Sequence, residues 1–159
     1  NPSDIKEYYQ DAEVVGDYLR RRTTQPLGAI MHREQVAFLN AVIAERAPRR
    51  LLEVAPGPAR LSAELRPVPM AVAAEFSPGM IATARARVRQ AGLPWSFVRA
   101  DAFSLPLAAD TFDLAFTLRF VRHFSLEDRA RLYGEFRRVL RPGGALILDA
   151  QNLAVRDAG

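Results

Sequence analysis

Five short apolar runs, separated by helical segments, constrain the fold of this chain more than any other feature. They span residues 49–55, 70–76, 96–101, 112–118 and 145–150. Runs of this length and composition are typical of strands that are buried on both faces of a sheet. Strands that alternate with helices form parallel sheets with right-handed crossovers. The sequence therefore predicts an α/β fold with a doubly wound, mostly parallel sheet.

The helical segments are marked by apolar periodicity and by capping residues. We expect helices over residues 3–22, in two pieces around Gly16, and over about 29–46. Serine N-caps predict two further helices, over residues 77–91 and 125–141. These helices are expected to alternate with the strands and to cover the sheet.

The pattern divides the chain into two parts. We assign residues 1–46 to an N-terminal helical lid segment and residues 47–159 to the core. Because the chain starts with Asn and few residues follow its last strand, we expect it to be a piece of a longer protein. No residue pattern bears on the oligomeric state, and a homodimer is left open.

Composition narrows the class of protein. Hydrophobic residues make up 49% of the 159 residues and charged residues 25%, the balance of an ordinary globular protein. No stretch approaches ~18 consecutive apolar residues and no signal-peptide pattern opens the chain, so we expect no membrane span and a cytoplasmic protein. The absence of cysteine and the presence of only two histidines exclude a cysteine nucleophile and lead us to predict no metal site.

The basic residues are almost all arginine, and the formal net charge is +4. A basic chain suggests nucleic acid as a first candidate partner. The arginines are spread over the whole sequence, however, and no run of five basic residues occurs. This distribution argues against nucleic acid and favours a small-molecule partner.

Residues suited to ligand binding stand at the carboxyl ends of three predicted strands. Residues 53–59 form a Pro- and Gly-rich turn, Glu75 ends the second strand, and Asp101 ends the third. Such a turn admits a ligand to the backbone, and an acid at the next strand end can accept ribose hydroxyls. Taken singly, each has an ordinary explanation as a turn, a capping carboxylate or an N-cap. Together they predict one nucleoside-binding edge of the sheet.

Five motifs follow one another in a fixed order over about residues 49–150. They are Leu51–Gly57, Glu75–Met80, Ala100–Leu107, Thr111–Asp113 and Leu140–Gly144. In order and spacing they resemble the class I S-adenosylmethionine-dependent methyltransferases. The closest likeness is to the small-molecule branch typified by the ubiquinone/menaquinone-biosynthesis C-methyltransferases, with a methyltransferase type 11-like domain. The resemblance implies a Rossmann-like sheet of order 3-2-1-4-5, S-adenosylmethionine as cofactor, and methyl transfer to C, O or N of a small-molecule acceptor.

The resemblance also implies roles for single residues. Those implied for the methionine part of the cofactor are Glu53, Ala55, Gly57 and the carbonyl of Thr117. Those implied for the nucleoside are Glu75 at the ribose hydroxyls, Phe76 and Met80 in packing, and Asp101, the Ala102 N–H and Phe103 at the adenine. Tyr9, Tyr18 and Arg22 are candidate lid contacts, with core packing or a solvated face as the alternative.

One histidine is a candidate general base. His123 follows the fourth predicted strand, where family members often have a histidine, although no partner carboxylate can be identified from the sequence. A solvent-facing loop histidine is the alternative interpretation. We interpret His32 and Trp95 as structural.

The chain departs from the family pattern in two respects. Ala55 and Ala59 stand where the family usually has the outer two of three alternating glycines. Alanine suits this close turn only if its φ stays negative. The last predicted strand lies close to the end of the given sequence, so we expect strands six and seven of the family to be absent from it and an apolar sheet edge to be left.

Two other function classes remain. A non-catalytic S-adenosylmethionine- or nucleoside-binding module would keep the fold without turnover. A nicotinamide-dependent oxidoreductase would also place an acid such as Glu75 on a ribose, but residues 55, 57 and 60 do not form its G-x-G-x-x-G fingerprint, and Asp101 would have no role.

Overall fold

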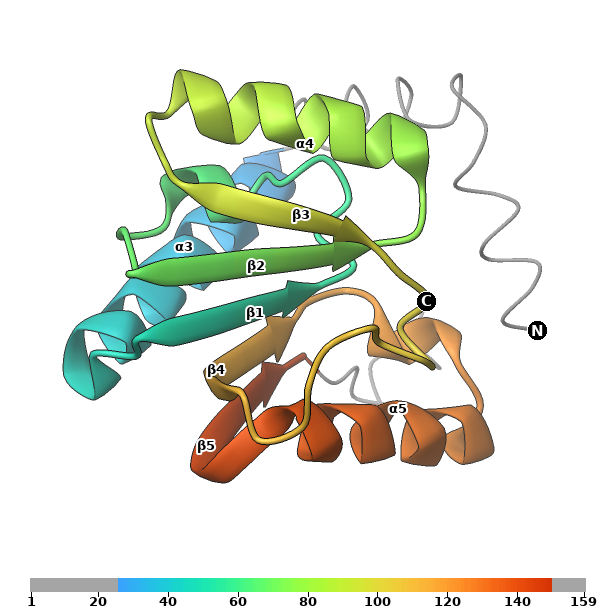
Figure 1. Cartoon of the computed structure of the whole chain (residues 1–159). Helices are drawn as coiled ribbons and strands as arrows, with labels where there is room; N and C mark the ends of the chain where they lie inside the picture. The colour runs from blue at the N-terminus through green and yellow to red at the C-terminus, as the bar shows by residue number, and fades with distance from the viewer. Residues whose placement is uncertain (1–25, 150–159) are drawn as a thin grey trace.

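A single five-stranded sheet organises the part of the chain that the computed structural model describes, residues 26–149 (Figure 1). Its strands are β1 (Arg50–Val54), β2 (Met70–Glu75), β3 (Trp95–Arg99), β4 (Phe112–Thr117) and β5 (Leu140–Leu148). They lie in the order β3-β2-β1-β4-β5, and every neighbouring pair is parallel. The predicted doubly wound sheet and its order are therefore confirmed. The strand order reverses between β1 and β4, which is where ligands bind in sheets of this kind.

Three α-helices and two 3₁₀-helices accompany the strands in the described part of the chain. They are α3 (Pro26–Arg46), η1 (Ser62–Glu64), α4 (Pro78–Gln90), η2 (Val121–His123) and α5 (Leu126–Val139). The Oγ atoms of Ser77 and Ser125 accept hydrogen bonds from the N–H groups of Met80 and Asp128, which confirms both predicted N-caps. The helix expected over residues 3–22 lies outside the described residues.

The helices cover opposite faces of the sheet. Leu39 and Ile43 of α3 pack with Leu51 on one face, and Phe136 and Val139 of α5 pack with Leu52 and Val54 on the other. Successive residues of a strand point to opposite faces, so adjacent β1 residues join two separate core clusters. A third cluster holds α4 against the sheet through Ala84 and Val88. The carboxyl ends of the strands are thereby fixed at one edge.

The predicted alternation of strand and helix is wrong at two connections. Between β1 and β2 the only described helix is the short η1, and a loop without a helix joins β3 to β4. That loop contains Pro106, which cannot donate a backbone hydrogen bond inside a helix. It is held instead by an isolated bridge between Asp101 and Ser104 and by contacts to α5.

The fifth strand also differs from its predicted bounds. It begins at Leu140 rather than at residue 145, because the chain becomes extended as soon as α5 ends. Leu140 pairs with Phe112 and Ala145 pairs with Leu114, so the residues between them form a bulge. Pro142 and Gly143, whose φ is 79°, account for this irregularity.

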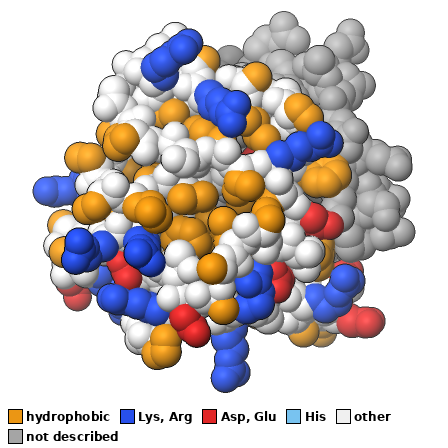
Figure 2. Space-filling model, in the orientation of Figure 1, with side chains coloured by type: hydrophobic (Ala, Val, Ile, Leu, Met, Phe, Trp, Pro, Cys, Tyr) orange, Lys and Arg blue, Asp and Glu red, His pale blue; other side chains and the backbone are white. Residues whose placement is uncertain are grey.

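On the face that Figure 2 shows, the arginine side chains of the described residues are spread out rather than gathered in one place. In this view hydrophobic side chains occupy the middle of the face and the basic ones lie around them. Among the described helices, none is long and apolar enough to span a bilayer.

Candidate nucleoside-binding site

The turn after β1 is built on three left-handed residues. Ala55, Gly57 and Ala59 have φ values of 56°, 56° and 54°. The condition that φ stays negative at the two alanines is not met, since the turn demands the same geometry at all three alternate positions. A non-glycine residue in this region is strained by about 1–2 kcal/mol. The Ala55 N–H donates to the Ala74 carbonyl at 2.9 Å, which holds the start of the turn beside the end of β2.

No α-helix follows this turn directly in the described chain, because η1 is the only helix between β1 and β2. The Gly57 N–H instead donates to Oε2 of Glu75 at 3.0 Å. A Cβ added at Gly57 would meet only the Sδ of Met80, at 4.0 Å, so space remains beside the backbone there. A ligand can therefore come close to the backbone of this turn, and the Glu75 carboxylate fixes the orientation of that backbone at Gly57.

Glu75, the last residue of β2, is 8% exposed and is held by backbone donors. Its Oε1 accepts the N–H groups of Phe76 and Ser77 at 2.8 and 2.9 Å, and Oε2 accepts that of Gly57. Burial raises the pKa of Glu75 above its usual value, and the three backbone hydrogen bonds oppose that rise. The result is a carboxylate in one fixed orientation at the carboxyl edge.

Glu53 is a second buried acid on this edge, 3% exposed on β1. Its Oε2 accepts a hydrogen bond from the Ser62 hydroxyl. Burial raises the pKa of Glu53 to about 8, the Ser62 hydrogen bond opposes this, and the nearby charge of Glu75 raises it further. Two acids whose pKa values are both raised by burial thus lie on adjacent strands.

The loop after β3 carries the third acid. Oδ1 of Asp101 accepts the N–H of Phe103 at 3.0 Å, and its carbonyl accepts the N–H of Ser104 at 3.0 Å. The N–H of Ala100 donates to the Glu75 carbonyl at 3.0 Å. This contact ties the start of the loop to the end of β2, so the acids of β2 and β3 are placed relative to one another.

A cavity at the carboxyl ends of the strands brings most of the predicted residues together. Those that line it are Glu53, Ala55, Gly57, Glu75, Phe76, Met80, Asp101, Ala102, Phe103 and His123. Thr117 is not among its lining residues; it is fully buried, and its Oγ1 has no hydrogen-bond partner in the described part of the chain. Its neighbours Leu118 and Arg119 line the cavity instead. The lid candidates Tyr9, Tyr18 and Arg22 lie outside the described residues.

The sequence interpretation missed a histidine on the cavity wall. His32 and Gln35 of α3 line the cavity, and Nε2 of His32 lies 2.7 Å from Oε1 of Glu64. His32 therefore has a carboxylate partner. His32 lies on the same face of α3 as the buried residues Leu39 and Ile43, closer to the start of the helix. A polar residue on such an apolar face is the feature of the sequence that could have marked His32 as a site residue.

An aromatic cluster forms another wall. Phe124 meets Phe103 and Phe120 edge to face, with ring centroids 5.2 and 4.9 Å apart, and all three line the cavity. Fixed acids beside an apolar aromatic wall suit a ligand that has hydroxyl or amino donors and a flat ring. A nucleoside has this combination.

Comparison with known proteins agrees with this geometry. Residues 52–148 match a family model described as a methyltransferase domain. A demethylmenaquinone methyltransferase of Thermus thermophilus is 40% identical over 108 residues, which cover 65% of this chain and 48% of that protein. The chain spans about half the length of this curated relative.

Solved structures share the fold. A crystal structure of the [4+2]-cyclase SpnF is 29% identical with a TM-score of 0.58, covering 69% of this chain and 43% of that one. An S-adenosylmethionine-dependent methyltransferase from Clostridium acetobutylicum has a TM-score of 0.63 at 18% identity, covering 74% and 49% of the two chains. The second likeness concerns the fold alone.

Proposed function

The chain belongs to the methyltransferase domain family, and on that premise we propose that it transfers a methyl group from S-adenosylmethionine to a small-molecule acceptor. The observation that carries the proposal is the convergence of Glu75 and Asp101 on one cavity beside the left-handed turn at Gly57. Each acid is oriented by backbone N–H groups, so each presents its remaining acceptor sites in a fixed direction.

The residues present fit the cofactor. Glu75 would accept the ribose hydroxyls, with Phe76 and Met80 packing beside it. Asp101 would accept a hydrogen bond from the adenine amino group. The main chain at Ala102 and the ring of Phe103 would form the rest of the adenine site. The methionine end would lie along Glu53, Ala55 and Gly57, where a neutral Glu53 carboxyl and exposed main chain can hydrogen-bond its charged groups.

When bound, the cofactor supplies an electrophilic methyl group on its sulfonium sulfur. The protein's main task is then to hold the acceptor in line and to exclude water, which can contribute up to about 7–11 kcal/mol. The wall of Phe103, Phe120 and Phe124 serves both purposes, since it is apolar and its rings fix one another.

An acceptor that loses a proton needs a base. His123 is the proposed base because its exposed side chain lines the cavity just after β4. His32 is the second candidate, because it lines the cavity and its contact with Oε1 of Glu64 fixes the orientation of its ring. Replacing each by glutamine and comparing turnover at fixed cofactor saturation distinguishes them.

The acceptor class is proposed from the cavity and from the relatives. A flat, mostly apolar ring fits the aromatic wall, and demethylmenaquinone, named for the Thermus relative, is the first acceptor to test. Transfer of labelled methyl to extractable product supports the proposal, and labelling of added nucleic acid instead would contradict it. We place the reaction in the cytoplasm.

A non-catalytic or differently reacting module is the second candidate, because a cyclase shares this fold. The two are separated by supplying cofactor with a panel of quinols, phenols and amines. Release of S-adenosylhomocysteine dependent on an acceptor favours the methyltransferase, whereas tight binding with no release for any acceptor favours the module.

A further inference from the structure

Helix α5 presents a polar stripe beside its buried one. Leu132, Phe136 and Val139 are buried against the sheet. Arg131, Glu135 and Arg138 have the same i, i+4, i+7 spacing one position earlier, so they also share a face. All three of these polar residues contact the loop that joins β3 to β4.

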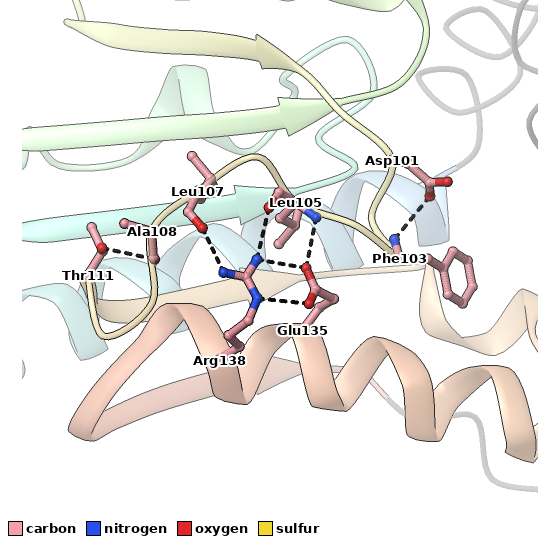
Figure 3. A network of polar contacts seen from close by, with 8 residues as sticks. All are labelled: Asp101, Phe103, Leu105, Leu107, Ala108, Thr111, Glu135 and Arg138. Atoms are coloured by element: carbon pink, nitrogen blue, oxygen red, sulfur yellow. Dashed lines mark hydrogen bonds and ion pairs between the residues drawn. The ribbon is translucent and has the colours of Figure 1, made fainter.

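The contacts are directed at the main chain of the loop (Figure 3). Oε2 of Glu135 accepts the Leu105 N–H at 2.8 Å. The Arg138 guanidinium donates to the carbonyls of Leu105 and Leu107 at 2.8 and 2.7 Å. It also donates two hydrogen bonds to the Glu135 carboxylate, at 2.9 and 2.8 Å, which fix the orientation of the guanidinium plane.

This network fixes one end of the turn that carries Asp101. The other end is fixed by the Ala100 N–H on the Glu75 carbonyl. Leu105 follows the Asp101–Ser104 bridge directly, and its side chain is 5% exposed in the core. The Arg131 guanidinium lies over the Phe103 ring, 5.0 Å from its centroid. The turn is therefore held between β2 and α5.

We propose that Glu135 and Arg138 are positioning residues for adenine recognition. They fix the Asp101–Phe103 turn from α5, outside the cavity that the adenine would enter. The proposal rests on the proposed function, since it takes Asp101 to accept the adenine amino group. Neither residue lines the cavity, so both act through the loop. Selectivity for the purine then depends on a helix that the ligand does not touch.

Amide hydrogen exchange tests the positioning without any ligand. Arg138→Met and Glu135→Ala should raise the exchange rates of the Leu105 and Phe103 amides about tenfold or more. Arg137→Met is the matched control, because Arg137 is exposed on the same helix and makes no contact to this loop that the structure describes. Unchanged exchange at both amides in both variants would overturn the proposal.

Selectivity tests the consequence for the ligand. The wild type should bind S-adenosylhomocysteine more tightly than S-inosylhomocysteine, in which a carbonyl replaces the amino group that Asp101 would accept. The ratio of the two dissociation constants should fall at least about threefold in Arg138→Met and Glu135→Ala and stay constant in Arg137→Met. Glu135→Gln, which keeps an acceptor for Leu105, should restore part of the ratio.

The possible failures are distinguishable. A lower melting temperature with an unchanged ratio would show that α5 only supports the fold, which contradicts the proposal. A wild type that binds neither compound would contradict the proposed function, and amide exchange would still decide whether α5 fixes the turn.

Discussion

The carboxylate of Glu75 accepts a hydrogen bond at 3.0 Å from the backbone N–H of Gly57, eighteen residues earlier in the chain. The contact joins the end of β2 to the turn after β1. Glu75, the acid proposed to bind the ribose, and Gly57, where a ligand can come close to the backbone, are therefore held together by this hydrogen bond. Changes at Glu75 should consequently affect both stability and cofactor binding.

Glu75→Gln tests this coupling. A glutamine amide cannot accept on its nitrogen, so at least one of the three backbone donors loses its partner. We expect unfolding free energy to fall by about 1–3 kcal/mol and cofactor affinity to fall about tenfold or more. Urea unfolding and calorimetry measure the two effects; a variant with unaltered values for both would refute the assigned role.

Ala55→Gly tests the strain in the turn. Glycine adopts a φ of 56° without a Cβ penalty, although it gains entropy in the unfolded chain. We expect a net gain of about 0.5–1 kcal/mol in unfolding free energy. Ala82→Gly, in the exposed interior of α4, is the control and should lose about 1 kcal/mol. Equal losses in both variants would show that the turn is not strained.

The same turn shows why the sequence predicted some features and missed others. The strands and the two serine caps followed from local apolar runs and capping chemistry, and the strand order followed from the family resemblance. The φ values of Ala55 and Ala59 did not, because propensity argues against left-handed alanine and only the surrounding contacts impose it. The His32–Glu64 pair and the contacts of Glu135 and Arg138 to the loop after β3 join residues that are far apart in the sequence, so no local pattern predicts them. Only His32, a polar residue on the apolar stripe of its helix, gave a signal in the sequence.

The buried acid Glu53 should make stability depend on pH. Its pKa is about 8 in the folded protein and near 4.5 when unfolded, so the folded state binds the proton more tightly. This contribution is complete below about pH 4.5 and is lost as pH rises toward 8, with a slope of up to about 1.4 kcal/mol per pH unit.

Glu53→Gln, which mimics the neutral carboxyl, should remove that part of the slope. Unfolding free energies at pH 5.5 and 7.5 should differ more in the wild type than in the variant. A residual slope of the same sign is expected from Glu75, whose pKa is also raised. Identical slopes in the two proteins would contradict the assignment to Glu53.

Asp113 provides a test at the opposite edge of the sheet. Its Oδ2 accepts the N–H groups of Arg49 and Arg50 at 2.6 and 2.8 Å, and its Oδ1 lies 2.7 Å from Nε of Arg141. Asp113→Ala should lower unfolding free energy by about 1–2 kcal/mol, because water replaces part of these contacts. Cofactor affinity should stay the same, and a large loss of affinity in the folded variant would mean that the site is not confined to the carboxyl edge.

In the proposed complex, Asp101 and Glu75 together hold the adenine and the ribose of S-adenosylmethionine at the carboxyl edge of the sheet. The most direct measurement is calorimetric titration of the wild type and of Asp101→Ala with S-adenosylhomocysteine and with NAD. We predict that the wild type binds S-adenosylhomocysteine and not NAD, and that Asp101→Ala weakens the binding about tenfold or more, as expected for the loss of a hydrogen bond to an ionised acceptor worth ~1.5–3 kcal/mol. Binding of NAD alone, or equal affinity of wild type and variant for S-adenosylhomocysteine, would contradict it.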